Sequence, residues 1–140
     1  MSRKQVVILG AGFAGLQLAK RIKHSDYEIT IIDQYNFHQF QPLLYQVATA
    51  RLEPSSISFP LRKVFQKKPE VHVRLAKVTE VDMVLQKVMT DAGTFSYDYL
   101  VIATGCTTNY FGNKNIEQFS FPMKSTTEAI TLRNHILMNF

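Results

Sequence analysis

The sequence has a single cysteine, no long hydrophobic run and few charged residues. Cys106 has no partner for an internal disulfide, and no group of cysteine and histidine residues has the spacing of a zinc site. The longest apolar run, residues 6–16, has eleven residues, whereas a membrane-spanning helix needs about 20. We therefore expect no disulfide, no metal and no transmembrane helix, in a reducing, cytoplasmic setting.

Charged residues make up 19% of the 140 residues, and hydrophobic residues make up 46%. This composition excludes a disordered tail and allows a buried core. The length has room for one domain. We therefore expect a single domain over residues 1–140.

The net charge of +5 is concentrated in one segment. Residues 51–77 contain seven basic and two acidic residues, so this segment alone carries +5. A solvated helix face is the simpler interpretation, and attraction to a membrane surface, a nucleic acid or an acidic partner is the alternative. No aromatic-and-basic pattern of a nucleic-acid module accompanies the segment, so we expect no nucleic-acid partner.

The first 33 residues have the pattern of a βαβ unit. Residues 5–9 form a β-branched run that ends in glycine, as buried parallel strands do. Ala14, Leu18 and Ile22 then recur at helical spacing. Residues 28–32 predict a second strand, which ends at Asp33. A strand, a glycine turn, a helix and a strand within about 30 residues predict parallel pairing.

The rest of the chain predicts an inserted meander and a return to the parallel sheet. Residues 36–68 are irregular and are interrupted by prolines. Residues 71–81, 87–90 and 94–97 alternate like antiparallel strands, and residues 99–103 predict a strand in the parallel sheet. The predicted fold class is α/β, with a Rossmann-like parallel sheet and an antiparallel β-meander insertion.

A last helix is predicted from a capping box, Ser125-x-x-Glu128. Its apolar stripe reaches Phe140 without a glycine, a proline or a cap. We therefore expect the chain to be an incomplete part of a longer protein, and self-association through the C-terminal helix is a further expectation.

The main motif is Gly10-Ala11-Gly12-Phe13-Ala14-Gly15, directly after a strand and at the start of a helix. Glycines at this spacing allow a tight turn, the approach of a pyrophosphate and close helix–strand packing. The helix N-terminus favours phosphate. Asp33 is suited to the hydroxyls of a ribose and would repel the 2′-phosphate of NADP. The motif therefore predicts binding of the ADP half that NAD and FAD share.

Ala103-Thr104-Gly105, after the apolar segment Tyr97-Asp98-Tyr99-Leu100-Val101-Ile102, resembles the second fingerprint of flavoprotein reductases that bind two dinucleotides. These enzymes belong to the pyridine nucleotide-disulfide oxidoreductase superfamily. The resemblance implies that the first G-x-G-x-x-G holds FAD and that a later one holds NADH or NADPH.

Phe37-His38-Gln39-Phe40-Gln41-Pro42-Leu43-Leu44-Tyr45-Gln46-Val47-Ala48-Thr49 closely resembles a stretch of type II NADH dehydrogenases. These are single-polypeptide NADH:quinone oxidoreductases that do not pump protons. The segment Asn109-Tyr110-Phe111-Gly112 is also similar to theirs. The resemblance covers nearly all of this chain but only the N-terminal part of the family's length.

The resemblance implies a set of FAD-binding residues. It assigns the pyrophosphate to Gly10, Ala11, Gly12, Phe13, Ala14 and Gly15, and the adenosine ribose to Asp33 with Gln34 beside it. The backbone of Val78 is expected at the adenine. Gln41 and Pro42 are expected on the flavin side, and Ala103, Thr104 and Gly105 are expected to close over the cofactor.

The same resemblance implies an activity for the longer protein. Hydride would pass from NADH to FAD, and electrons would pass to a respiratory-chain quinone at the inner face of the membrane, where the protein would be peripheral. The chain has no second G-x-G-x-x-G, so we expect the fragment alone to be inactive, and we name no catalytic side chain in it. Residues 34–60 contain no cysteine, which excludes the dithiol mechanism of the disulfide reductases.

Two other functions remain open from the residues alone. The chain is alternatively a stand-alone Rossmann module that binds NAD or ADP-ribose without redox chemistry, or a folded piece that binds nothing and self-associates. His38 is a lone histidine in an aromatic loop, where a structural role is commoner than proton transfer near a flavin. Tyr45 and Gln46 are expected to approach quinone in the longer enzyme.

Overall fold

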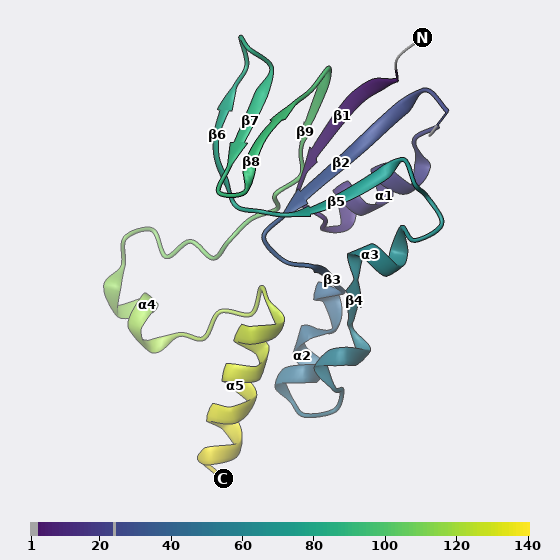
Figure 1. Cartoon of the computed structure of the whole chain (residues 1–140). Coiled ribbons are helices and arrows are strands. Elements are labelled where there is room, and N and C mark those ends of the chain that lie inside the picture. The colour runs from purple at the N-terminus through teal and green to yellow at the C-terminus, as the bar shows by residue number, and fades with distance from the viewer. Residues whose placement is uncertain (1–2, 24) are drawn as a thin grey trace. The chain divides into compact units, whose positions relative to one another are not determined.

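The computed structural model describes residues 3–23 and 25–140 (Figure 1). Contacts within the chain divide it into two compact units. Unit 1 comprises residues up to His38 together with residues 60–105, and unit 2 comprises residues 39–59 and 106–140. The chain therefore leaves unit 1, builds part of unit 2, returns and leaves again.

A parallel four-stranded sheet forms the centre of unit 1. Its order is β5-β2-β1-β9, and each neighbouring pair is parallel. The central strands are rich in valine and isoleucine because both faces of the sheet are covered. The strands are β1 (Lys4–Leu9), β2 (Tyr27–Asp33), β5 (Val71–Leu75) and β9 (Tyr99–Ile102). The strands predicted at 5–9, 28–32 and 99–103 are therefore confirmed.

Helix α1 (Phe13–Arg21) packs on one face of this sheet, together with residues of the short helix α3 (Leu61–Val64). The buried residues of α1 are Gly15, Leu16 and Ala19. Of the three residues in the expected stripe, Leu18 and Ile22 pack against this core and are partly buried, whereas the prediction is wrong for Ala14, which is exposed. Small side chains at 15 and 19 let the helix approach the sheet closely, so they occupy the contact face.

An antiparallel meander covers the opposite face of the sheet. Its strands are β6 (Val78–Asp82), β7 (Lys87–Thr90) and β8 (Gly93–Ser96), in that order. Val88 is fully buried against Val7, Leu9 and Ile32 of the parallel strands. The expected α/β sheet with a meander insertion is thus confirmed.

The single strand expected over residues 71–81 is wrong. The chain turns at Ala76 and Lys77, so its first half becomes β5 beside β2, and its second half becomes β6 in the meander. Both halves alternate in the same way along the sequence, and the two-residue turn between them contains neither glycine nor proline. The local pattern therefore carries no signal for the break.

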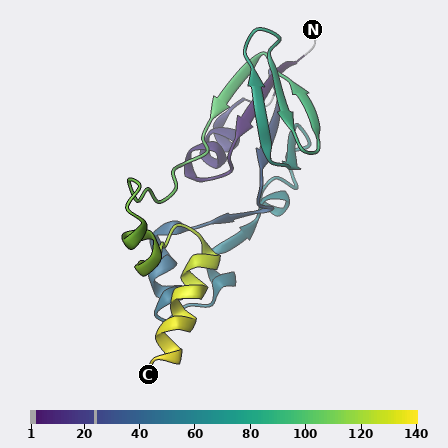
Figure 2. The same ribbon diagram turned by 90° about the vertical axis from the view of Figure 1, so that its left-hand side faces the viewer.

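Unit 2 is a small helical assembly (Figure 2). Buried Leu44, Val47 and Ala48 of α2 pack with Ala129 of α5 and with Ile57. The helices of unit 2 are the short 3-10 helices η1 (Gln41–Leu43) and η2 (Pro54–Ser56) and the α-helices α2 (Leu44–Ala48), α4 (Lys114–Phe119) and α5 (Thr126–Met138). The chain crosses between the units through β3 (Phe37–Gln39) and β4 (Ser58–Pro60), which form a two-stranded sheet.

The capping box at the start of α5 is present. The Ser125 hydroxyl accepts a hydrogen bond from the Glu128 N–H at 3.2 Å, and the Glu128 carboxylate accepts one from the Ser125 N–H at 2.9 Å. The far end of this helix leaves Leu137 and Met138 exposed. None of the helices in the described residues has the length and apolar character required to cross a membrane.

Candidate functional site: the glycine turn of unit 1

The candidate site lies where β1, β2 and β9 end. From β1 the chain moves to β2 and β5 on one side, and later returns to β9 on the other side. The strand order therefore reverses between β1 and β9. In open parallel sheets, ligands bind beyond the carboxyl ends of the strands at this switch point. The glycine motif follows β1 directly, at that place (Figure 1).

Two of the three glycines are required by the protein itself. Gly10 has a φ of +97°, its N–H donates to the Ile32 carbonyl at 2.8 Å, and a Cβ on it would collide with the Ala103 carbonyl. A Cβ on Gly15 would collide with the Gly10 carbonyl and come within 3.1 Å of the Ile8 side chain. These glycines hold the turn against β9 and α1 against the turn.

Gly12 differs from these two because nothing lies within 4 Å of where its Cβ would be. Its φ of −67° is open to any residue. It is the N-cap of α1, whose first turn contains no acidic residue. The open space therefore lies at the positive end of a helix dipole, where an anion is stabilised.

Asp33, at the end of β2, reaches across to this turn. One carboxylate oxygen accepts the Ala11 N–H at 2.6 Å, and the other accepts the Tyr35 N–H at 2.8 Å. The side chain is half-buried. A carboxylate oxygen has two lone pairs, so Asp33 is oriented by the backbone and retains capacity to accept hydroxyl donors. The structure thus brings the predicted acid to the predicted glycines.

His38 is the residue at this site whose position the sequence did not indicate. It is 7% exposed, its Nδ1 lies 2.9 Å from the Ala11 carbonyl oxygen, and its ring meets that of Phe13 edge-on with centroids 5.3 Å apart. A carbonyl oxygen only accepts hydrogen bonds, so Nδ1 carries the proton. The glycine turn is thus held from β2 and from β3.

The second expected fingerprint lies beside the first. The Ala103 N–H donates to the Leu9 carbonyl at 2.8 Å, which places Ala103 against Gly10. Thr104 and Gly105 follow in exposed positions, and Gly105 has a φ of +72°. The two segments come from distant parts of the sequence and form one wall at the ends of β1 and β9.

The remaining expected residues lie in different surroundings. Val78 begins β6 and packs in the cluster between the sheet and the meander, while Gln34 is exposed directly after β2. The Ala76 N–H donates to the Asp33 carbonyl at 3.0 Å, so the turn before Val78 borders the end of β2. These positions lie along the same edge of the sheet.

Gln41 and Pro42 belong to unit 2, where they form η1 with Leu43. The Gln41 side chain donates to the Lys124 carbonyl at 3.2 Å. Both residues are exposed. Tyr45 and Gln46 follow on α2, where the Gln46 amide donates to the Tyr45 hydroxyl at 2.9 Å.

The charged groups with shifted pKa values lie at the opposite, amino ends of the strands. Hydrogen bonds from Gln5 and His72 hold the pKa of Glu28 below its ordinary 4.5. A hydrogen bond from Lys4, and a second from the Gln5 N–H, lower the pKa of Asp98. Within the described residues, no three histidine, cysteine, aspartate or glutamate side chains are grouped to hold a metal ion, and Cys106 is exposed.

A protein-family model described as pyridine nucleotide-disulphide oxidoreductase matches residues 4–136. The chain belongs to this family. The glycine turn, the Ala103-Thr104-Gly105 segment and the meander all lie within the matched residues. The resemblance to the superfamily inferred from the glycine and Ala103-Thr104-Gly105 segments is confirmed.

Within the pyridine nucleotide-disulphide oxidoreductases, the chain is 42% identical over 142 aligned residues to the type II NADH:quinone oxidoreductase Ndh of Mycobacterium tuberculosis. The match covers 99% of this chain and 31% of that protein. A type II NADH:quinone oxidoreductase of Staphylococcus aureus is 33% identical and is covered to 34%. The chain thus spans about a third of the length of these relatives, and the expected resemblance to type II enzymes is confirmed.

Solved structures share the fold. NDH2 from Plasmodium falciparum superposes with a TM-score of 0.89 at 24% identity, covering 98% of this chain and 29% of that one. The sulfide:quinone oxidoreductase of Aquifex aeolicus gives 0.86 at 28% identity, covering 96% of this chain and 32% of that one.

Proposed function

We propose that unit 1 binds the ADP half of FAD at the glycine turn. The observation that carries the proposal is the hydrogen bond from the Ala11 N–H to the Asp33 carboxylate, next to Gly12, where a Cβ would meet nothing within 4 Å. Backbone N–H groups and the dipole at the start of α1 suit a pyrophosphate, and an oriented carboxylate suits ribose hydroxyls. The choice of FAD rather than NAD rests on the resemblance of this first glycine motif to that of flavoprotein reductases with two dinucleotides, and the chain's membership of the pyridine nucleotide-disulphide oxidoreductases supports it.

The residues present fit this group in a specific way. The space that a Cβ would take at Gly10 and at Gly15 is filled by the protein's own backbone. The corresponding space at Gly12 is open, and a side chain there would fill it. The proposed roles are the whole turn of Gly10, Ala11, Gly12, Phe13, Ala14 and Gly15 around the phosphates, with Gly12 as the point of closest approach, Asp33 and Gln34 at the ribose, and Val78 at the adenine. Ala103, Thr104 and Gly105 would cover the cofactor, and Gln41 and Pro42 would face the flavin.

We further propose that the whole protein is an NADH:quinone oxidoreductase and that this chain is its FAD-binding portion, a single partial domain over residues 1–140. FAD, when bound, supplies the hydride and electron transfer between NADH and quinone. This chain contributes binding and orientation. The relative named a type II NADH:quinone oxidoreductase is about three times as long as this chain. We assign no catalytic side chain to this chain.

The test is a titration of the chain with FAD and, separately, with NAD, in which binding is monitored by fluorescence and by the shift in thermal unfolding. Asp33→Ala should weaken FAD binding at least tenfold, since a hydrogen bond to a charged group contributes about 1.5–3 kcal/mol. Asp26→Ala removes an exposed aspartate before β2 and serves as the matched control. Preference for NAD would favour the stand-alone module instead, and binding of neither ligand would contradict a complete ADP site.

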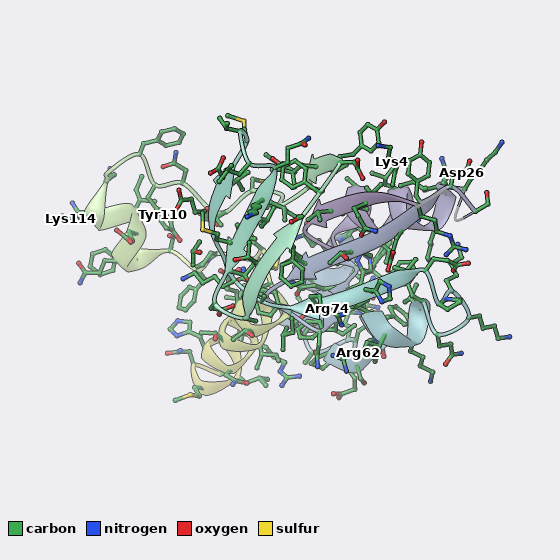
Figure 3. All side chains as sticks on the ribbon, turned by 45° about the horizontal axis from the view of Figure 1, so that its top comes forward. Lys4, Asp26, Arg62, Arg74, Tyr110 and Lys114 are labelled. Atoms are coloured by element: carbon green, nitrogen blue, oxygen red, sulfur yellow. The ribbon has the colours of Figure 1, made fainter. Side chains whose placement is uncertain are left out.

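We propose peripheral contact with an anionic membrane through the basic residues Arg62, Lys63, Lys67 and Arg74 of unit 1. Arg62 and Arg74, labelled in Figure 3, line the same concavity of about 300 Å³ between α3 and β5. Neither arginine, nor Lys63 or Lys67, forms an ion pair within the described part of the chain. Basic groups near an anionic surface contribute about 1 kcal/mol each.

Binding to vesicles with phosphatidylserine should fall when Arg62, Lys63, Lys67 and Arg74 are all changed to glutamine. The matched control removes four exposed basic residues elsewhere: Arg21, Lys23, Lys87 and Lys114. Equal loss in both variants would show that only net charge matters and would remove the site from the proposal.

Self-association is proposed for the exposed end of α5. Leu137 is 61% exposed and Met138 is 84% exposed. Glutamine at both positions should lower the weight-average mass in sedimentation at high concentration, whereas Met83→Gln with Val84→Gln, on another exposed apolar pair, should leave it unchanged. A monomer at every concentration would contradict the proposal.

A further inference from the structure

We propose that His38 is a positioning residue for dinucleotide binding, acting through the Ala11 carbonyl. The inference rests on the proposed function and deepens it. It assigns to a buried histidine the task of aiming a backbone N–H group at the phosphates.

The Ala11 backbone is held on both of its polar groups by side chains. Its N–H donates to Asp33 at 2.6 Å, and its carbonyl accepts from His38 at 2.9 Å. Ala11 itself is 2% exposed. The two partners come from different strands, so the peptide groups before and after Ala11 are each fixed by an independent anchor.

Fixing the Ala11 carbonyl also fixes the N–H of Gly12. The two groups belong to one planar trans peptide and point in opposite directions. When His38 holds the oxygen on its side, the Gly12 N–H is directed away from His38. Nothing lies within 4 Å of where a Cβ on Gly12 would be, so a phosphate is proposed to approach here, and the orientation of the Gly12 N–H decides whether the phosphate accepts from it.

The bond also changes the donor strength of that N–H. A hydrogen bond accepted by a carbonyl polarises its peptide, and the effect is larger where water is excluded. His38 is 7% exposed and its ring packs edge-on against Phe13. The surroundings therefore hold the ring with Nδ1 toward Ala11 and protect the bond from competing water.

Two substitutions separate the hydrogen bond from the packing. His38→Asn keeps a donor nitrogen two bonds from Cβ, as Nδ1 is, but removes much of the ring. His38→Phe keeps a ring against Phe13 and removes the donor. A structural role predicts that Phe is tolerated better than Asn in every measurement, whereas the positioning role predicts opposite orders for stability and for affinity.

We expect His38→Phe to weaken FAD binding about tenfold at a temperature where it is fully folded, because the Ala11 carbonyl loses its buried partner. His38→Asn should bind FAD within about threefold of the unchanged chain, even though its thermal stability falls further than that of His38→Phe. Equal affinity of both variants with the unchanged chain would overturn the proposal, as would a weaker affinity for Asn than for Phe.

A measurement without ligand separates this inference from the proposed function. The backbone amide ¹H and ¹⁵N resonances of Gly12 in the free protein should move upfield in His38→Phe, because its peptide is no longer polarised by a hydrogen bond to the Ala11 carbonyl, and should stay near their unchanged positions in His38→Asn. If FAD does not bind at all but this pattern of shifts appears, the positioning of the peptide stands and the proposed ligand fails. If FAD binds and both variants show the same Gly12 shifts, the positioning role fails.

Discussion

At the scale of single residues, the glycine turn shows that identical residues are required for different reasons. Gly10 and Gly15 are required by backbone that lies where their side chains would be, whereas Gly12 meets no such obstacle. The lack of a side chain at Gly10 and Gly15 is therefore required for unit 1 to fold. At Gly12 it is required only by the proposed ligand.

This distinction gives a first prediction. Gly12→Ala should fold with nearly unchanged stability, because its φ of −67° suits alanine, yet lose at least tenfold in FAD affinity. Gly15→Ala should lower the free energy of unfolding by several kcal/mol through overpacking. Thermal unfolding and FAD titration on both variants check it. An unstable Gly12→Ala, or an FAD affinity unaffected by it, would contradict the assignment.

The sequence could predict the residues whose spacing is local. The glycines and Asp33 lie within one βαβ unit, so their meeting follows from parallel pairing. The contact between His38 and Ala11 spans 27 residues and depends on the path of β3, which no periodic pattern specifies. Ala103 was predicted through a family resemblance, but its contact with Gly10 required the strand order.

At the scale of secondary-structure elements, side chains link the three strands β1, β2 and β5 across their amino ends. The Gln5 amide donates to Glu28 at 3.0 Å, and the His72 Nε2 lies 2.9 Å from the other carboxylate oxygen. Lys4 pairs with Asp98 at 2.9 Å in front of β9. The edge opposite the proposed site is thus joined by polar contacts.

These contacts predict a pH dependence. Because hydrogen bonds lower the pKa of Glu28 in the folded protein, its stabilising contribution is complete above the ordinary 4.5 and is lost as the pH falls through the lower folded value. Glu28→Gln should therefore flatten the fall in unfolding free energy below pH 4.5. Denaturant unfolding between pH 6 and 3 measures this, with Glu80→Gln on an exposed glutamate as the control. Identical acid dependence in both variants would contradict the prediction.

The capping box predicts a second effect at this scale. Ser125→Ala should destabilise α5 by about 1 kcal/mol, because the Glu128 N–H loses its acceptor. Ser125→Asp should preserve the helix because aspartate caps as well as serine does. Hydrogen exchange of the first-turn amides of α5 distinguishes the two, and equal protection in both variants would show that packing against α2 alone holds this end.

Element boundaries were predictable where propensity and packing agree. β1, β2, β9 and the start of α5 are of this kind. The division of residues 71–81 into β5 and β6 was not, because the same alternation serves a strand beside β2 and a strand in the meander. The buried face of α1 was predicted only in part: the expected Leu18 and Ile22 pack at its edge, while the close approach to the sheet places Gly15, Leu16 and Ala19 at its centre.

At the scale of the whole molecule, burial is uneven. Ile8, Ile29 and Ile31 in the parallel sheet are fully buried, whereas α4 has no buried residue. The sequence carried no sign of two compact units, because unit 2 combines residues 39–59 with residues 106–140. The single partial domain over residues 1–140 stays a prediction, because both units are built from interleaved segments of the same chain.

Uneven burial predicts uneven protection across the molecule. Amides of β1 and β2 should exchange most slowly, with protection close to the global free energy of unfolding, and those of α4 should exchange fastest. Hydrogen–deuterium exchange followed by mass spectrometry measures this directly. Protection of α4 equal to that of β1 would show that another surface covers α4 in solution.

The position of β1 has a consequence for synthesis on the ribosome. β1 leaves the ribosome shortly before β2, so these two strands can pair early. The other neighbour, β9, is more than ninety residues behind, as the Lys4–Asp98 contact across 94 positions shows. Until it emerges, one side of the central strand stays open on the nascent chain, where an unpaired edge invites wrong pairing. The turn at Gly10 therefore gains its contact with Ala103, which follows β9, only late in synthesis. Chaperones that bind exposed strands have that interval in which to act.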